Sequence, residues 1–127
     1  MGLKFISSVV FVKDIKTSRQ FYEDFLQLKI ADDYGENIAY HCGLSIWQSG
    51  HAYDNIFKNS PDELVKENHG YSHELYFETD NIDEVFEEAA KCKVKIMHGI
   101  TNQPWSQKVF RVYDPDGNIV EIGEIMS

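Results

Sequence analysis

The tetrapeptides Val12-Lys13-Asp14-Ile15 and Thr79-Asp80-Asn81-Ile82 stand 67 residues apart and follow one pattern. Each ends an apolar run, then gives a residue that caps a helix, and then begins an apolar helical face. In the second copy, Glu84 follows Asn81 by three residues and completes a capping box. An internal repeat of this kind predicts two copies of one supersecondary unit.

The elements around the tetrapeptides repeat as well. Helical spacing predicts helices over 14–28 and 81–91, the first with Phe21, Tyr22, Phe25 and Leu28 on its apolar face. Residues 114–117, Asp-Pro-Asp-Gly, fit a type I turn between the last two strands. Strands are predicted over 4–12, 29–33, 37–42, 44–48, 72–79, 93–98, 108–113 and 118–122. The order βαβββ, connection, βαβββ predicts an α+β fold in which two modules form a curved mixed sheet with a concave ligand cup.

The chain of 127 residues has the size of one domain. We expect module one at about residues 1–50, a connecting loop at about 51–71 and module two at about 72–127. Short helices are expected near 55–58 and 62–67. A connection of this length is usually functional or mobile, and a solvated linker is the alternative.

The charge balance narrows the class of partner. Twelve Lys and Arg against 21 Asp and Glu give a net charge of −9, which argues against nucleic acid or an anionic membrane as partner. No apolar run reaches the length of a membrane span, and the first residues do not read as a secretory signal. Cys42 and Cys92 are the only cysteines, so we expect a reducing cytoplasm and two buried or half-buried thiols.

Three segments resemble the vicinal oxygen chelate superfamily, which includes glyoxalase I, bleomycin-resistance proteins and extradiol dioxygenases. They are residues 9–15, residues 74–79 and, most specifically, residues 112–121, Val-Tyr-Asp-Pro-Asp-Gly-Asn-Ile-Val-Glu. The resemblance covers nearly the whole chain. It implies the fold but leaves the chemistry open, since one scaffold hosts many activities.

The resemblance also implies where metal ligands would stand in metal-dependent members. It places them at Ser7, Glu74 and Glu121, with a fourth position among 45–47, Ser-Ile-Trp. The resemblance implies His or Gln at the position of Ser7 and His at the position of Glu74, so only Glu121 matches the usual pattern. No set of two histidines and one carboxylate can be assembled at the expected positions.

Strand alternation assigns side chains to faces independently of the family. Val10 and Val12 are predicted to pack on the first helix. The cup would then receive Phe5, Ser7, Val9 and Phe11 from the first strand, and Glu74, Tyr76, Glu78, Ile119 and Glu121 from the second module. His73 has the wrong parity for the cup unless a one-residue bulge changes the register.

Glu74 and Glu121 form the sharpest candidate pair. Repulsion and burial would raise one pKa and supply a base near neutral pH. The two carboxylates are also suited to hold a divalent metal or clamp a cation. A wetted sheet face or pairing with Lys or Arg is the structural alternative. Trp47 and Trp105 are candidate walls of the cup, and Tyr53, Phe57 and Tyr71 are candidates to bring apolar surface over it.

Two functions remain open. The first is a small-molecule binder without metal or other cofactor, taking a cationic or neutral aromatic ligand with Phe5, Ser7, Val9, Trp47, Tyr76 and Trp105. The second is a lyase or isomerase of the glyoxalase I type, similar to lactoylglutathione lyase, using Glu121 and Glu74 with one divalent metal ion. An extradiol dioxygenase would need an iron site that the sequence does not show. In either case we expect a homodimer.

Overall fold

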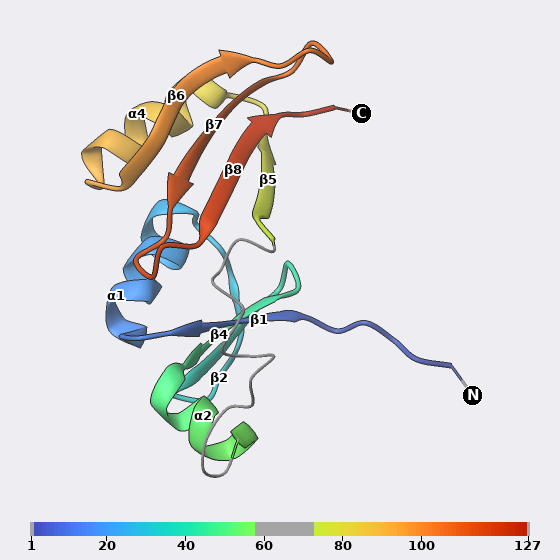
Figure 1. Cartoon of the computed structure of the whole chain (residues 1–127), viewed down its shortest axis with the longest axis vertical. Coiled ribbons are helices and arrows are strands. Elements are labelled where there is room, and N and C mark those ends of the chain that lie inside the picture. The colour runs from blue at the N-terminus through green and yellow to red at the C-terminus, as the bar shows by residue number, and fades with distance from the viewer. Residues whose placement is uncertain (1, 58–72, 127) are drawn as a thin grey trace. The chain divides into compact units, whose positions relative to one another are not determined.

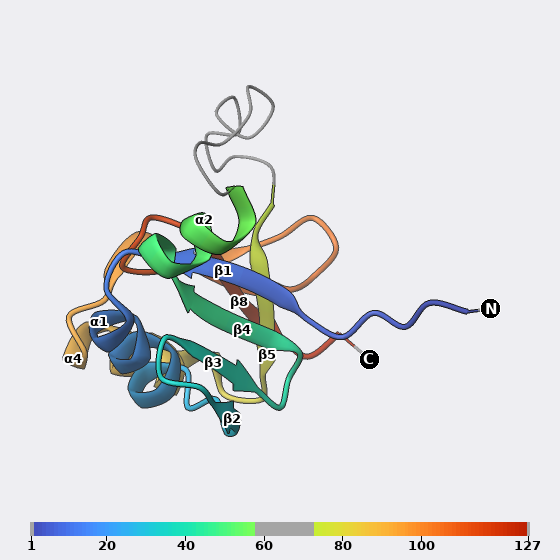
Figure 2. The same cartoon turned by 90° about the horizontal axis from the view of Figure 1, so that it is seen from below.

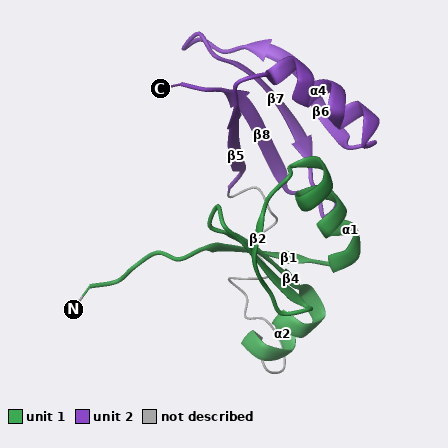
Figure 3. Cartoon of the chain, turned by 180° about the vertical axis from the view of Figure 1, so that it is seen from behind, with its two compact units in different colours: residues 1–67 green, residues 68–127 purple. Residues whose placement is uncertain are grey.

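The computed structural model describes residues 2–57 and 73–126 (Figure 1, Figure 2). The chain divides into two compact units, residues 1–67 and 68–127, which we describe one at a time (Figure 3). The short helix expected at 62–67 and the side chains of Phe57 and Tyr71 lie outside the described part. No helix in the described ranges is long and apolar enough to cross a membrane.

Unit one is a four-stranded mixed sheet with three helical segments. In chain order they are β1 (Ser8–Val12), α1 (Ile15–Arg19), η1 (Gln20–Phe25), β2 (Ile30–Asp33), β3 (Asn37–Tyr40), β4 (Leu44–Gln48) and α2 (Ser49–Phe57). The strands lie in the order β1-β4-β3-β2 (Figure 2). The β1–β4 pair is parallel and the other two pairs are antiparallel.

Unit two repeats this topology. Its elements are β5 (Leu75–Thr79), α4 (Ile82–Lys91), β6 (Lys95–Asn102), β7 (Lys108–Tyr113) and β8 (Ile119–Glu124). The order β5-β8-β7-β6, with a parallel β5–β8 pair, matches that of unit one strand for strand. The predicted α+β class and the two βαβββ modules are therefore confirmed. Strand pairing among the described residues stays within each unit, so a single sheet around one cup stays a prediction.

The first helix is built differently from the expected single α-helix over 14–28. Asp14 caps it, accepting the backbone N–H of Lys16 at 3.1 Å. After Arg19 the chain widens into the π-helix η1, in which the N–H of Leu26 reaches the carbonyl of Phe21. The predicted apolar residues Phe21, Tyr22 and Phe25 are buried, and Leu28 is half-buried.

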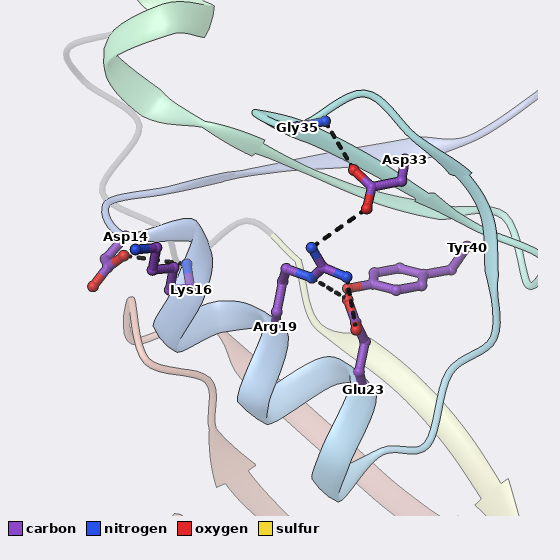
Figure 4. Close-up of polar contacts among 7 residues, drawn as sticks. All are labelled: Asp14, Lys16, Arg19, Glu23, Asp33, Gly35 and Tyr40. Carbon is purple, nitrogen blue, oxygen red and sulfur yellow. Dashed lines mark hydrogen bonds and ion pairs between the residues drawn. The ribbon is translucent and has the colours of Figure 1, made fainter.

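A charged network ties η1 to the hairpin of β2 and β3 (Figure 4). The carboxylate of Glu23 receives Nε of Arg19 at 2.7 Å and the hydroxyl of Tyr40 at 2.9 Å. Arg19 also lies 3.5 Å from Asp33, whose other oxygen accepts the N–H of Gly35. Burial, followed by the bond to Glu23, raises the pKa of the Tyr40 phenol well above its ordinary value. Tyr40 therefore stays a neutral donor.

The helix α4 has defined caps at both ends. Asn81 accepts the N–H of Glu84 at 3.2 Å, so the predicted N-cap is confirmed. The other end is a Schellman motif, in which the N–H of Lys93 reaches Ala90 and that of Val94 reaches Ala89. Lys93 stands at the position that favours glycine and has a φ of 57°.

Replacing Lys93 with glycine is expected to raise the free energy of unfolding by about 0.5–1 kcal/mol, because a left-handed backbone strains a residue that carries a Cβ. Urea unfolding measures the change. Lys93→Ala is the matched control, since it removes the charge and keeps the Cβ. An equal gain in both variants would show that the lysine charge, and not the backbone, is the cause.

Each sheet packs one face against its helix. In unit two, the ring of Phe86 on α4 meets the ring of Phe110 edge-on, with centroids 5.1 Å apart. Around this contact lie the fully buried side chains of Val112, Val120 and Ile122. In unit one, the corresponding layer consists of Val10, Val12, Ile38 and Ile46 with Phe21 and Tyr22. The predicted core positions Val10, Val12, Phe21 and Tyr22 are confirmed.

Several predicted bounds were wrong. The first strand begins at Ser8 and not at residue 4, and Phe5 before it is 82% exposed. The expected loop after β4 begins with helix α2, and β6 runs to Asn102, four residues beyond its predicted end. Cys42 and Cys92 are exposed, because both lie at turns that end secondary-structure elements.

The strand β2 is the outer strand of its sheet on the side away from β1. All four of its residues are exposed, and a bulge interrupts its pairing with β3 between Ile30 and Asp32.

Candidate functional site

The face of the unit-two sheet that α4 does not cover carries the candidate carboxylates. Glu121 on β8 stands between Tyr76 on β5 and Arg111 on β7 in the strand register. Glu74 is two residues before Tyr76 and shares its side of the strand. We call this surface, formed by Glu74, Tyr76, Arg111 and Glu121, the polar face. Strand alternation therefore predicted the facing of Glu74, Tyr76 and Glu121 correctly.

Arg111 lies between the two candidate carboxylates. Its Nη2 donates to Oε1 of Glu121 at 2.5 Å, and its Nε lies 3.6 Å from Oε1 of Glu74. The side chain of Glu121 is 8% exposed and that of Arg111 is 27% exposed. A carboxylate this buried needs a charged partner, and the guanidinium supplies it.

His98 completes the cluster and was missed by the sequence prediction. Its Nδ1 lies 2.8 Å from the carbonyl of Gly99, and a carbonyl only accepts, so Nδ1 carries the proton. The lone pair of Nε2 then accepts Nη1 of Arg111 at 3.1 Å. This arrangement depends on a β-bulge. Ile96 pairs with Val112 and His98 with Arg111, so two steps on β6 match one step on β7.

Glu74 has a raised pKa. Loss of solvation is the first cause and repulsion from Glu121 the second, while Arg111 acts in the opposite direction. The folded protein therefore binds this proton more tightly than the unfolded chain does. The protonated Glu74 side chain therefore contributes to the free energy of unfolding. This contribution is fully present below pH 4.5, the ordinary pKa of a glutamate, and is lost as the pH rises through the raised pKa of Glu74.

The Glu74→Gln variant is accordingly expected to gain stability relative to the wild type between about pH 4 and about pH 7. Urea unfolding of both proteins across this range measures the difference. Glu87→Gln, an exposed position on α4, is the matched control and should show a flat difference. A Glu74→Gln variant that loses stability relative to the wild type as pH rises would contradict the direction of the shift.

Two exposed aromatic side chains lie beside this cluster. Tyr76 is 45% exposed and its hydroxyl donates to Oε2 of Glu78 at 2.7 Å. Trp105 is 53% exposed and its indole N–H donates to Oε1 of Gln107 at 2.7 Å. Gln107 is 2% exposed and bonds to the Tyr76 hydroxyl as well. The polar face thus combines carboxylates with available ring surface.

The remaining candidates lie in unit one. Ser7 accepts the hydroxyl of Ser45 at 3.4 Å, and Val9 is 42% exposed. The indole N–H of Trp47 donates to Nδ1 of His51 at 3.0 Å. The ring of Phe11 meets the rings of Trp47 and Tyr53 edge-on. Helix α2 therefore packs partly on the sheet face that was predicted to line the cup.

The residues present do not fit a divalent metal of the kind the family implies. The described part of the chain holds no group of three or more His, Cys, Asp or Glu side chains arranged to bind a metal ion. Ser7 is a poor ligand, and the two carboxylates flank the guanidinium of Arg111 instead. Arg111 provides the positive charge that this pair requires.

Two βαβββ units with a charged sheet face place the chain in the vicinal oxygen chelate class. Residues 5–127 match the family model of the glyoxalase-like domain, and the chain belongs to this family.

Solved structures agree with this assignment. A protein of unknown function from Agrobacterium tumefaciens str. C58 is 35% identical, with a TM-score of 0.86 over 99% of this chain and 97% of that chain. A glyoxalase-related enzyme from Fulvimarina pelagi is 18% identical, with a TM-score of 0.78 over 96% of this chain and 88% of that one. The lactoylglutathione lyase of Agrobacterium tumefaciens is 20% identical, with a TM-score of 0.67 over 98% and 95%. The last two show the fold alone. The comparison with curated proteins finds no match.

Proposed function

We propose that this protein binds a small organic molecule on the polar face of unit two, without a tightly held metal, and that the ligand is cationic or neutral and at least partly aromatic. One observation carries the proposal. The exposed ring of Tyr76 lies beside Glu74 and Glu121, and the guanidinium of Arg111 between these carboxylates is already engaged by Glu121 and His98.

Electrostatics supports a cation over an anion. Glu74, Glu78 and Glu121 carry three negative charges against the single positive charge of Arg111. A cation over an aromatic face gains about 0.5–2 kcal/mol, depending on how far it is desolvated. An anion would have to compete with Glu121 for the guanidinium. A planar cation therefore matches both the charge and the ring surface.

Matched ligands test this proposal. Calorimetry with N-methylacridinium, neutral acridine and acridine-9-carboxylate at neutral pH compares three charges on one ring system. We expect the cation to bind most tightly, and we expect Glu74→Gln and Glu121→Gln to weaken it, with Glu87→Gln as the control. Tighter binding of the carboxylate, or no effect of either substitution, would refute the charge argument.

Elemental analysis tests the absence of a metal requirement. Protein purified without chelator is expected to carry well below one equivalent of zinc, nickel, manganese or iron, because Arg111 occupies the carboxylate pair. Arg111→Met checks whether removal of the guanidinium alone changes the metal content. One tightly bound equivalent in the wild type would overturn this part of the proposal.

A lyase or isomerase of the lactoylglutathione lyase type is the second candidate. The pKa of Glu74 is raised, and this favours the second candidate. A lyase or isomerase needs a carboxylate that accepts a proton, and a raised pKa makes Glu74 a better base at neutral pH. One equivalent of bound metal in the elemental analysis would favour this lyase or isomerase over the metal-independent binder. To test this candidate, the same protein preparation is loaded with metal and assayed for isomerisation.

A homodimer remains part of the proposal. Leu3 is 97% exposed, Phe5 82% and Ile6 70%, all on the segment before β1. Such apolar side chains favour burial against another chain. Light scattering at micromolar concentration measures the mass, and a strictly monomeric mass would contradict the dimer.

A further inference from the structure

We propose that Gln107 is a positioning residue that holds Trp105 and Tyr76 as a preformed aromatic pair for a planar ligand. This inference rests on the proposed binding function and adds to it the residue that orients the rings. Gln107 immediately precedes β7, and its side chain is buried although it contacts two exposed aromatic side chains.

The hydrogen bonds fix the amide of Gln107 in one orientation. Its Oε1 accepts from the indole N–H of Trp105 at 2.7 Å, and an indole only donates. Its Nε2 donates to the main-chain carbonyl of Glu124 at 2.7 Å, and a carbonyl only accepts. Rotating the amide by half a turn would break both bonds, so the amide has one assigned orientation.

The same amide decides how Tyr76 is presented. Nε2 of Gln107 also donates to the Tyr76 oxygen at 2.8 Å, so the phenol proton turns away and is donated to Glu78 at 2.7 Å. The hydroxyl thus uses its donor and one acceptor site within the protein. What Tyr76 offers outward is its ring, which suits stacking and cation–π contact.

The backbone around Gln107 is adapted to this role. A Cβ added at Gly123 would lie 2.5 Å from Nε2 of Gln107, so only glycine leaves room for the amide. The carbonyl of Gln107 accepts the N–H of Gln103 at 2.8 Å, and Ser106 donates back to Gln103 at 2.9 Å, which closes the turn that carries Trp105. Gln107 therefore contacts the turn through its main-chain carbonyl and Trp105, and strand β5 through the Tyr76 hydroxyl.

Anchoring two rings before the ligand arrives should increase affinity. Fixing a side chain on binding costs free energy, and this cost is removed when the side chain is already fixed. For Trp105 and Tyr76 together, the expected effect of losing the anchor is about a tenfold loss of affinity. A residue that only stabilises the fold would lower stability without this change.

The experiment uses a Trp47→Phe background, in which Trp105 is the only tryptophan. Gln107→Met removes all three amide bonds at similar size, whereas Gln107→Glu keeps an acceptor for Trp105 and loses the donor to Tyr76. We expect the fluorescence anisotropy of Trp105 to fall in Gln107→Met and to persist in Gln107→Glu. Gln107→Met should bind N-methylacridinium about tenfold more weakly, with a less favourable binding entropy.

Gly123→Ala is a second variant, in which Gln107 is retained but the added methyl group displaces its amide. It tests the inference even if the Gln107→Met protein fails to fold. It should lower both anisotropy and affinity. Unchanged anisotropy and affinity in Gln107→Met or Gly123→Ala, with normal binding by the parent, would overturn the role of Gln107 alone. Absence of binding by the wild type would overturn the proposed function, while the anisotropy still decides whether Gln107 holds Trp105.

Discussion

Replacing Arg111 with methionine is expected to lower the free energy of unfolding by about 3 kcal/mol at neutral pH. Methionine keeps the length and apolar stem of the side chain, so packing changes little. The loss comes from Glu121, whose side chain is 8% exposed and would lose the guanidinium at 2.5 Å. Glu74 would lose its opposing charge as well and repel Glu121 more strongly.

Urea unfolding with a double-mutant cycle separates these contributions. Arg111→Met combined with Glu121→Gln should recover most of the loss, because the buried charge is then gone. Lys108→Met, an exposed cation on the same strand, is the matched control and should change stability by less than about 0.5 kcal/mol. A similarly small effect of Arg111→Met would show that solvent, and not Arg111, compensates the charge of Glu121.

Replacing Asp114 with alanine is expected to cost about 2–4 kcal/mol, the second large effect. Its carboxylate is buried in the turn between β7 and β8. One oxygen accepts the N–H groups of Asp116 at 2.9 Å and Asn118 at 2.8 Å, and the other accepts the Asn118 side chain at 2.9 Å. Alanine would leave these donors to water in a turn that joins the two central strands of unit two.

Asp114→Asn tests whether the charge or the geometry matters. An amide oxygen can still accept the two backbone N–H groups, but its nitrogen would face the nitrogen of Asn118, so about half of the loss should remain. Asp80→Ala, at an exposed aspartate before α4, is the control. Thermal unfolding measures all three. A loss below about 1 kcal/mol for Asp114→Ala would mean that the backbone alone holds the turn.

The same turn shows what the sequence determines well. The Asp-Pro-Asp-Gly order demands a bend, and Gly117 adopts a φ of +89° with its N–H bonded to Asp114. Once the turn is fixed, alternation places Val120 and Ile122 on the helix side and Glu121 on the other. Local chemistry and period-two alternation agree here, so the facing of the carboxylates was predictable.

His98 and Arg111 show where such prediction ends. Alternation from Ile96 puts His98 on the helix side, and only the bulge on β6 brings it to Arg111. Gly99, a glycine within a strand, was a signal for a bulge, although it does not fix the position. The facing of Arg111 was not predicted, because the register of β7 on β8 decides that it meets Glu121.

The helices show a similar boundary. Burial of Phe21, Tyr22 and Phe25 is compatible with both an α-helix and a π-helix, so the apolar spacing alone could not reveal η1. Glycine disfavours helix interiors, and Ser49 and Gly50 were placed at the end of module one, before the expected loop at about 51–71. In the structure both belong to the first turn of α2, where Trp47 bonds to His51. Tertiary packing overrides local propensity at this point.

The exposed, bulged strand β2 has a consequence for the behaviour of the protein in concentrated solution. An outer strand with unpaired amides is a template on which strands of other chains can assemble into aggregates. The bulge between Ile30 and Asp32 breaks the regular spacing of that template, and the carboxylates of Asp32 and Asp33 would be desolvated by any strand that added there. The four residues of β2 therefore protect the protein against edge-to-edge aggregation. This protection should persist in salt concentrations that screen the net charge of −9.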